Sequence, residues 1–374
     1  MNAIPEPRST PDAITPERGD AGDGASRVLY FITSYGTGAQ LQRLLRTLLT
    51  GDPDCAVVIH HDRFQADLDL GDLADHDDVH VLTSDEPIVW GDLSLEQARW
   101  RVFEWSLRHM EFGWMVLLSE QDYPLVPIRD ITDGLRRCGA DALIEAVPIE
   151  QIDDPHHLRE LRPHHRLDCR RRYEYRYQVV PRLGLTDGWP DQARTASRHL
   201  RRALYFTVNA VQKKVVLYSF HDKLGMGTKV GVRSTRPPFD ANFPCWYSSA
   251  WFALSRRAVR SVVAFVTENE DFVEHYEDTI IPVESATATI VCNDPGLRVA
   301  RRSLHYVRWS DRGSGRPDVL TAHDAGELLR SGFYFARKLD LVTEPELFDI
   351  LDRTVLAEPV AEKAVEHASA DSGG

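Results

Sequence analysis

The segment Trp114–Leu125 (WMVLLSEQDYPL) places a cluster of polar side chains directly after an apolar run. The run Trp114–Leu118 has the pattern of a strand that is buried on both faces of a parallel sheet. The polar residues that follow it are Ser119, Glu120, Gln121 and Asp122. Because open α/β sheets bind ligands just beyond the carboxyl ends of their strands, we expect these side chains to line a site.

Two later segments carry charged groups suited to catalysis. Ile280–Thr289 (IIPVESATAT) contains the isolated carboxylate of Glu284, and Phe335–Asp340 (FARKLD) contains the adjacent cations Arg337 and Lys338. A lone carboxylate can accept a proton, whereas cations can stabilise a phosphate that leaves. These groups predict an enzyme with a charged substrate that carries a leaving group, although Glu284 could instead cap a helix.

The segment Pro244–Ser255 (PCWYSSAWFALS) combines aromatic rings with small hydroxyl groups. A sugar ring has an apolar C–H face and a polar rim, so this mixture of side chains suits a carbohydrate. The alternative is that the rings are ordinary core residues, which we expect for at least Trp251 or Phe252.

The segment Asp153–Gln178 is dense in His, Arg and Tyr. Its histidines form the adjacent pairs His156-His157 and His164-His165 rather than the HxxxH or CxxC spacing of zinc sites, which favours a solvated loop and helix over a metal site. Its arginines and tyrosines could bind phosphate or RNA. The net charge of −13, however, disfavours nucleic acid as a partner.

The elements that must position these groups alternate between strands and helices. Strand 28–33, helix 41–48 and strand 56–59 form a βαβ unit, which is typical of a parallel sheet. No GxGxxG follows the first strand, which counts against a dinucleotide-binding fold. Further strands are expected at 79–82, 114–118 and 142–146, and further helices at 95–107, 128–138, 256–266 and 322–331.

The 374 residues suffice for one large domain or two smaller ones, and the 43% hydrophobic content is that of a soluble globular protein. No apolar run approaches the roughly 18 residues of a membrane span, and the N-terminus lacks the apolar core of a signal peptide. We therefore expect a cytoplasmic protein, whose five scattered cysteines are reduced. Residues 1–25 and 358–374 lack apolar periodicity and are expected to be disordered tails.

Six short motifs occur in one collinear order between about residues 27 and 342. They are His60-His61-Asp62, Trp90–Ser94, Leu118–Leu125, Ser248–Arg256, Pro282–Thr287 and Arg316–Asp340. Together they resemble the core-2/I-branching β-1,6-N-acetylglucosaminyltransferase family, which includes the peptide O-xylosyltransferases. The resemblance is to a soluble, bacterial type of member, because the disulfides and membrane anchor of the eukaryotic proteins have no counterpart here.

The resemblance implies a GT-A fold and inverting transfer of a sugar from a UDP-sugar to a hydroxyl of a glycan or another acceptor. It implies that Glu284 is the general base and that Lys338 and Arg337 stabilise the UDP leaving group without a metal or other cofactor. Arg316 is a less firmly aligned third cation. N-acetylglucosamine is the favoured sugar, while xylose and other UDP-sugars remain alternatives because the motifs are shared.

The resemblance also divides a domain at 26–345 into a nucleotide-sugar half, 26–150, and an acceptor and catalytic half, 151–345. Residues expected to hold the nucleotide sugar are Asp62, Trp90, Gly91, Gln121 and Asp122. Residues expected to border the acceptor are Trp246, Tyr247, Ser248 and Trp251.

One departure from the family pattern leaves the role of metal open. The family usually has Gly where this chain has Glu120, and the resulting pair Glu120 and Asp122 could bind a divalent metal. A non-catalytic carbohydrate-binding protein on the same fold is a third hypothesis. The sequence does not identify the acceptor or the oligomeric state.

Overall fold

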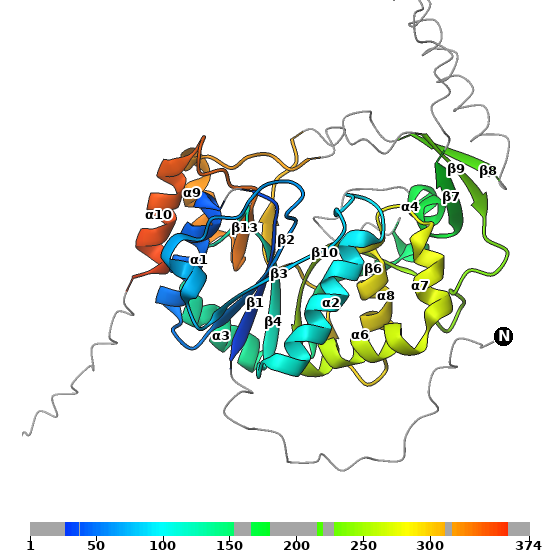
Figure 1. Ribbon diagram of the computed structural model, residues 1–374, viewed down its shortest axis with the longest axis horizontal. Coiled ribbons are helices and arrows are strands. Elements are labelled where there is room, and N and C mark those ends of the chain that lie inside the picture. The colour runs from blue at the N-terminus through cyan, green and yellow to red at the C-terminus, as the bar shows by residue number, and fades with distance from the viewer. Residues whose placement is uncertain are drawn as a thin grey trace, which may run out of the picture.

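The computed structural model describes residues 27–36, 38–152, 166–179, 215–219, 228–310 and 316–357. A seven-stranded sheet with the order β11-β6-β10-β4-β1-β2-β3 forms the centre of this part of the chain (Figure 1). Its strands are β1 (Val28–Ser34), β2 (Ala56–His61), β3 (Val79–Thr83), β4 (Trp114–Ser119), β6 (Ala142–Pro148), β10 (Trp246–Ser255) and β11 (Val299–Ala300).

The central sheet is mostly parallel. Strands β4, β1, β2 and β3 pair in parallel, as do β6 and β11, whereas β10 runs antiparallel to both of its neighbours. The chain therefore enters β10 at the same edge of the sheet where β1, β2, β4 and β6 end. This arrangement brings the polar ends of the parallel strands close to the aromatic start of β10.

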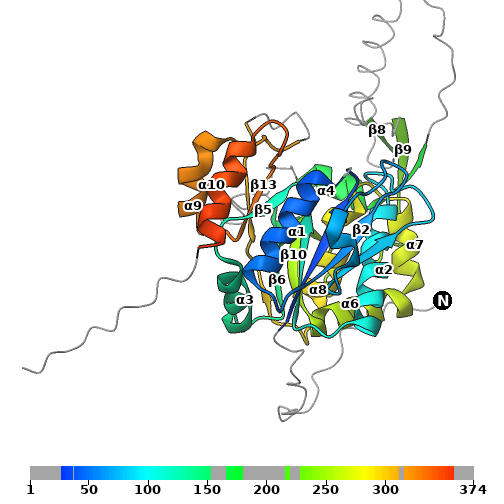
Figure 2. The same cartoon turned by 60° about the vertical axis from the view of Figure 1, so that its left-hand side comes forward.

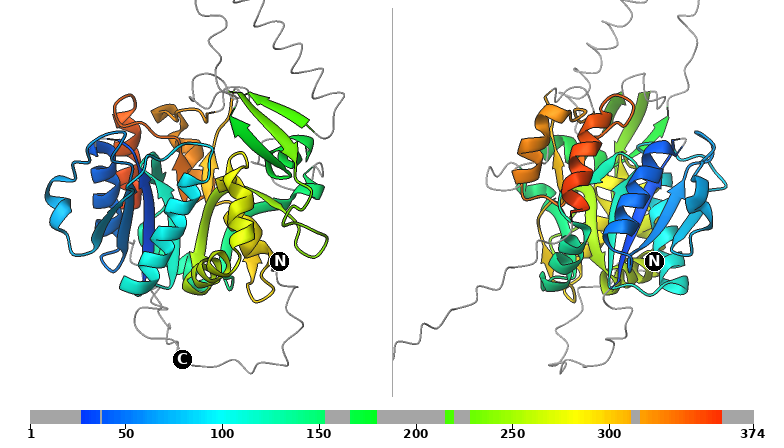
Figure 3. Two further views of the ribbon diagram at one scale, coloured as in Figure 1. Left: turned by 45° about the vertical axis from the view of Figure 1, so that its right-hand side comes forward. Right: turned by 90° about the vertical axis from the view of Figure 1, so that its left-hand side faces the viewer.

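Helices cover both faces of the sheet, because alternate residues of each strand face opposite sides (Figure 3). Tyr30 and Ile32 face a core that includes α1 (Ala39–Gly51), α3 (Ile128–Arg137), α9 (Ala325–Arg330) and α10 (Pro345–Val355). Leu29 and Phe31 face a second core. Its helices are α2 (Ser94–His109), α6 (Arg256–Glu268), α7 (Glu270–Glu277) and α8 (Ala286–Asn293).

Two smaller sheets flank the central one (Figure 2). The first has the order β12-β13-β5, formed by β12 (His305–Val307), β13 (Phe335–Arg337) and β5 (Asp122–Pro124). The second has the order β7-β9-β8, formed by β7 (Tyr175–Val179), β9 (Thr228–Arg233) and β8 (Val215–Ser219), and it follows α4 (Arg166–Tyr173). The β12-β13-β5 sheet is important for the site because it joins the C-terminal segment to the end of β4.

The predicted fold class is confirmed: the chain has an α/β fold with a mostly parallel central sheet flanked by helices. The elements expected at 28–33, 56–59, 114–118 and 142–146 are strands β1, β2, β4 and β6. The helix expected at 322–331 begins as a 3₁₀ turn, η6 (Ala322–Asp324). No helix within the described ranges is long and apolar enough to span a bilayer.

The domain predicted at 26–345 ends at the first residue of α10. Leu347, Phe348 and Leu351 of this helix are fully buried in the core beside α1 and α3. The ring of Phe348 meets that of Tyr123 edge-on at 4.8 Å. The packed part of the chain thus continues past residue 345, whereas the tails predicted at 1–25 and 358–374 lie outside the described residues.

Truncation of Phe348 tests whether α10 belongs to the folded unit. We expect Phe348→Ala to lower the free energy of unfolding by about 3–5 kcal/mol, because it removes a fully buried ring and leaves a cavity. Urea denaturation measures this change. The matched control is Glu346→Gln on the exposed side of the same helix, which should change stability by less than about 0.5 kcal/mol. Equal effects of the two variants would contradict the assignment.

Candidate active site

The carboxyl ends of β1, β2 and β4 form one polar edge of the central sheet, at Ser34, Asp62 and Ser119. All three side chains are buried, with exposed fractions of 4 to 6%. The backbone nitrogen of Asp62 donates to the carbonyl of Ser34 at 2.9 Å, which ties the end of β1 to the loop after β2. The polar ends of β1, β2 and β4 therefore meet at one edge of the sheet.

Strand β13 brings a cation to this edge. In the antiparallel pairing of β13 with β5, Arg337 lies opposite Asp122, although the two residues are far apart in the sequence. Arg337 Nη1 donates to Asp122 Oδ1 at 2.8 Å and to Ser119 Oγ at 2.6 Å. The guanidinium carbon also lies 4.5 Å from the ring centroid of Trp251, within cation–π range. Arg337 is thus held on three sides.

Asp122 is an ionised carboxylate in a fully buried position. Burial by itself would raise its pKa, but Arg337, His305 and the backbone amide of Ser119 outweigh burial and lower the pKa below its usual value. The Ser119 amide donates to Oδ2 at 2.7 Å, and His305 Nε2 lies 3.6 Å from the same oxygen. Asp122 therefore fixes Arg337 and the end of β4.

Lys338 follows Arg337 and lies beside the turn after β4. The backbone nitrogen of Leu339 donates to the carbonyl of Gln121 at 2.9 Å. The side chain of Gln40 donates to the carbonyls of Glu120 and Leu339, at 2.8 and 3.1 Å. Burial, together with repulsion from Arg337 and Arg316, lowers the pKa of Lys338.

The fold therefore gathers the three predicted cations Arg316, Arg337 and Lys338 into one cluster. Tyr35 follows β1 and adjoins the cluster. Burial, and then Glu120, raise the pKa of the Tyr35 hydroxyl, while the nearby charges of Arg337 and Arg316 oppose this shift. The hydroxyl of Tyr35 donates to Gln121 Oε1 at 3.1 Å. Mutually repelling cations at the carboxyl edge of a parallel sheet are suited to binding a polyanion such as a diphosphate.

Glu284 lies on a separate turn, η5 (Pro282–Glu284), with its side chain 26% exposed. Arg172 Nη1, from α4, donates to Glu284 Oε2 at 2.7 Å. The hydroxyl of Ser248 on β10 donates to the backbone carbonyl of Glu284 at 3.2 Å. The carboxylate is thus oriented through one oxygen, and Oε1 makes no hydrogen bond within the described part of the chain.

The turn that carries Glu284 has a strained backbone. Ile281 has φ 55° and ψ 57°, the left-handed region that β-branched residues seldom adopt. Its amide donates to the carbonyl of Gly91 at 2.9 Å, and its carbonyl accepts from the hydroxyl of Tyr173 at 3.3 Å. The Trp90-Gly91 motif therefore contacts the turn that carries Glu284 through the backbone of Gly91, where a φ of 88° suits glycine.

A buried ion pair lies beneath the same turn. Glu96 and Arg99 of α2 are 0 and 3% exposed, and their side chains meet at 3.1 Å. Glu96 also accepts the backbone amide of Thr287 at the start of α8, while Arg99 donates to the carbonyl of Val283 at 3.5 Å. Burial raises the pKa of Glu96 and lowers that of Arg99, with the mutual attraction opposing both shifts.

The predicted acceptor residues occupy different environments. Trp251 is half-buried and packs on Arg337 and on the ring of His305, 5.1 Å away. Trp246 donates from Nε1 to Asn293 on α8 at 3.2 Å, and Tyr247 is only 3% exposed within the second core. Ser248 is also buried and contacts the backbone of Glu284. The roles of these residues toward an acceptor stay predictions.

A bulge in β10 explains how Trp251 and Ser248 reach the site. The pairing of β10 with β6 shifts register between Ser248 and Phe252, and Ala250 within the bulge has φ 70°. Bulges bend a strand and redirect its side chains, and they are frequent beside active sites. The aromatic residues Trp246, Tyr247 and Trp251 all lie within β10.

Of the predicted nucleotide-sugar residues, Asp62 and Trp90 come from two loops at the same edge. Asp62 Oδ1 accepts the backbone amide of Phe64 at 3.1 Å, while Trp90 is 42% exposed. Gln121 and Asp122 lie at the end of β4, with Asp122 inside the Arg337 network rather than open to solvent.

The pair Glu120 and Asp122 does not fit a metal site. Glu120 Oε2 already accepts from Ser34 Oγ and from the backbone amides of Tyr35 and Gly36. The oxygens of Asp122 accept from Ser119 and Arg337. No group of three metal-binding side chains occurs among the residues that the structure describes. Each carboxylate therefore already accepts hydrogen bonds from donors of the protein, which leaves no shared set of ligand oxygens between the two.

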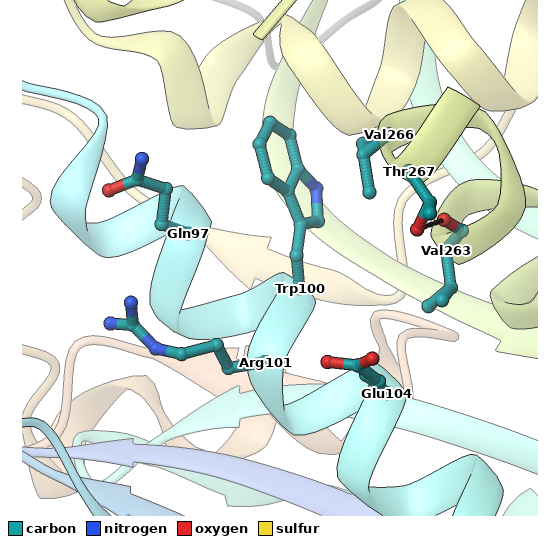
Figure 4. Close-up of a pocket in the computed structure, with 7 residues that line it drawn as sticks. All are labelled: Gln97, Trp100, Arg101, Glu104, Val263, Val266 and Thr267. Carbon is teal, nitrogen blue, oxygen red and sulfur yellow. Dashed lines mark hydrogen bonds between the residues drawn. The ribbon is translucent and has the colours of Figure 1, made fainter. Parts of the chain in front are cut away.

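A hollow of about 240 Å³ lies elsewhere, between α2 and α6 (Figure 4). In Figure 4 the ring of Trp100 projects between the two helices, with Gln97, Arg101 and Glu104 on the α2 side. None of the predicted site residues lines this hollow. It is part of the outer helical layer and not of the cation cluster.

Sequence reasoning missed Arg172, Glu96 and Arg99. Arg172 falls in the His, Arg and Tyr-rich segment whose role was left open, and no local pattern singles it out from its neighbouring arginines. Glu96 and Arg99 have the i, i+3 spacing of an ordinary surface pair on a helix. Their position just after the Trp90–Ser94 motif was the available signal. Residues 153–165 of the segment lie outside the described residues.

The fold and the site define an α/β protein with a cation cluster at the carboxyl edge of its sheet and a separate, oriented carboxylate. A profile described as Core-2/I-Branching enzyme matches residues 29–168 and 200–329. The chain belongs to the Core-2/I-Branching enzyme family, as the motifs indicated, and this is a family of glycosyltransferases that act on a sugar donor and an acceptor. No curated protein matches the chain.

Two solved structures show limited similarity. HddC from Yersinia pseudotuberculosis is 11% identical with a TM-score of 0.24, and the alignment covers 62% of this chain and 78% of that one. A197 from STIV is 12% identical with a TM-score of 0.18, and the alignment covers 32% of this chain and 46% of that one. Similarity at this level carries no argument about function.

The ionised state of Asp122 predicts a pH-dependent contribution to stability. Because its pKa is lowered in the folded protein, this contribution is present above the unfolded pKa of about 3.9 and is lost as the pH falls through the folded pKa. Asp122→Asn removes the contribution. Urea denaturation should give a difference in unfolding free energy between wild type and variant that is largest near neutral pH and shrinks below about pH 4. A constant difference would contradict the assignment.

Proposed function

We propose that this protein is an inverting GT-A glycosyltransferase that moves a sugar from a UDP-sugar to an acceptor hydroxyl without a metal. The observation that carries the proposal is the cluster of Arg316, Arg337 and Lys338 at the carboxyl edge of the sheet, separate from the oriented carboxylate of Glu284. Inverting transfer needs these two functions on different groups, because the nucleophile and the leaving group lie on opposite faces of the sugar.

In the proposed reaction, Glu284 Oε1 takes the proton of the acceptor hydroxyl as that oxygen attacks C1 of the sugar. The new C1–O bond forms while the bond from C1 to the β-phosphate oxygen breaks, and the electron pair stays on the phosphate. Arg172 keeps Oε2 of the base in place. Lys338 and Arg337 meet the charge that develops on the diphosphate, as a metal does in other enzymes.

The donor proposed first is UDP-N-acetylglucosamine, on the strength of the resemblance described above, with UDP-xylose as the principal competitor. Five residues are proposed to surround the nucleotide sugar, either by direct contact or by positioning the side chains that contact it: Asp62, Trp90, Gly91, Gln121 and Asp122. Trp246, Tyr247, Ser248 and Trp251 are proposed to shape the acceptor side. For Tyr247 and Ser248 this role is indirect, since both are buried.

The two alternatives have less support. A metal held by Glu120 and Asp122 would require both carboxylates to give up the donors that they now accept. A non-catalytic carbohydrate-binding protein has no need of an oriented base beside a cation cluster.

Glu284→Gln tests the base. We expect turnover to fall by about 10²–10⁴-fold, because the amide cannot accept the proton, while UDP binding is unchanged. Transfer assays and calorimetric UDP titration measure the two effects. Glu277→Gln, an exposed carboxylate on α7, is the control and should retain activity. Loss of UDP binding together with turnover would show that Glu284 is structural.

Lys338→Ala tests the leaving-group site and the absence of metal together. We expect UDP release from UDP-N-acetylglucosamine, UDP-xylose, UDP-glucose or UDP-glucuronate to persist in EDTA and to fall about 10²-fold or more in the variant. Arg129→Ala, an exposed cation on α3, is the matched control. If EDTA abolished UDP release, a metal would stabilise the leaving group. If Lys338→Ala left UDP release unchanged, the proposed role of Lys338 would be refuted.

A further inference from the structure

Glu120 places a negative charge inside the turn between β1 and α1. The side chain is 7% exposed, and Oε2 accepts from Ser34 Oγ at 2.7 Å, from the amide of Gly36 at 3.1 Å and from the amide of Tyr35 at 3.3 Å. Backbone amides at the end of the first strand are groups that can bind a phosphate in α/β proteins. In this protein the amides of Tyr35 and Gly36 donate to the carboxylate of Glu120 instead.

The turn is shaped around this carboxylate. A Cβ atom on Gly36 would lie 3.0 Å from Glu120 Oε1 and 3.2 Å from Oε2, so a larger residue would displace the carboxylate. Ser34 Oγ also lies 3.2 Å from Nδ1 of the buried His61, whose Nε2 lies 2.7 Å from the carbonyl of Ala66. The charge of Glu120 is therefore held at a fixed position.

That position adjoins the cation cluster. The pairing of β5 with β13 sets Asp122 opposite Arg337. The backbone hydrogen bond from Leu339 to Gln121 extends this pairing by one step, so Glu120 lies across from the backbone of Lys338 and Leu339. Gln40 links the carbonyls of Glu120 and Leu339 directly. Consistent with this proximity, Glu120 acts to raise the pKa of Lys338, against the stronger effect of burial.

A fixed carboxylate next to a diphosphate site acts unequally on donor and product. When the C1–O bond breaks, the electron pair remains on the β-phosphate, so UDP carries about one more negative charge than the UDP-sugar above pH 7. Repulsion by a neighbouring anion grows with the charge of the ligand. The carboxylate therefore disfavours the product more than the donor.

We propose that Glu120 is a built-in counter-anion that weakens the binding of the nucleoside diphosphate product relative to the sugar nucleotide and so promotes product release. This inference rests on the proposed function, and it concerns a position at which the chain departs from the family pattern. Glu120 acts through the charge of the site and is not a catalytic residue.

Glu120→Gln removes the charge and retains an oxygen acceptor for the turn. We expect the Kd of UDP to fall about three- to tenfold, the Kd of the sugar nucleotide to fall less, and product inhibition by UDP to strengthen. Calorimetric titration of the full chain with UDP and with the UDP-sugar, at pH 8, measures the ratio of the two constants. Glu120→Asp keeps the charge and should leave that ratio near the wild-type value.

Glu104→Gln on α2 is the control for net charge, since this half-buried carboxylate pairs with Arg108 away from β13. If Glu120→Gln does not fold, Glu120→Gly, which removes the charge and frees the Tyr35 and Gly36 amides, must still tighten UDP more than the sugar nucleotide. Equal tightening of both ligands, or no tightening, would overturn the inference. A wild-type chain that binds neither ligand would instead overturn the proposed function itself.

Discussion

The ion pair between Arg337 and Asp122 is the interaction on which the arrangement of the site depends. It joins β13, near the end of the chain, to the turn after β4, and it places Lys338 beside Gln121. Asp122 is fully buried, so its charge is tolerated only because Arg337, the Ser119 amide and His305 surround it. The backbone pairing of β13 with β5 and the hydrogen bond from Leu339 to Gln121 hold the same segments together, and the ion pair adds the contact that fixes the Arg337 side chain.

Buried charged side chains also fix the position of the turn that carries Glu284. The pair Glu96 and Arg99 holds the start of α8 and the carbonyl of Val283, while Arg172 holds the carboxylate itself. Pairing of buried charges adds little net stability, but removal of one partner leaves the other uncompensated. Such networks therefore fix geometry, which here includes the left-handed backbone at Ile281.

The two halves of the site differ in electrostatic character, and this difference matches the two tasks of the proposed reaction. The half proposed for the leaving group contains Arg316, Arg337 and Lys338, which repel one another, and it adjoins the carboxylate of Glu120. The half proposed for the general base contains Glu284, which Arg172 orients through one oxygen. Strand β10 connects them, since its bulge directs Trp251 to Arg337 and Ser248 to Glu284.

The sequence by itself determined the α/β class and the order of the main elements, and its motifs supplied Glu284, Arg337 and Lys338 as the proposed reactive positions, because apolar periodicity and collinear motifs are local properties. Only the tertiary structure decided that Asp122 and Glu120 accept hydrogen bonds from donors of the protein, and that Arg172 donates to Glu284. It also added α10 to the core. These outcomes depend on strand order and side-chain direction between distant segments, which local patterns do not encode.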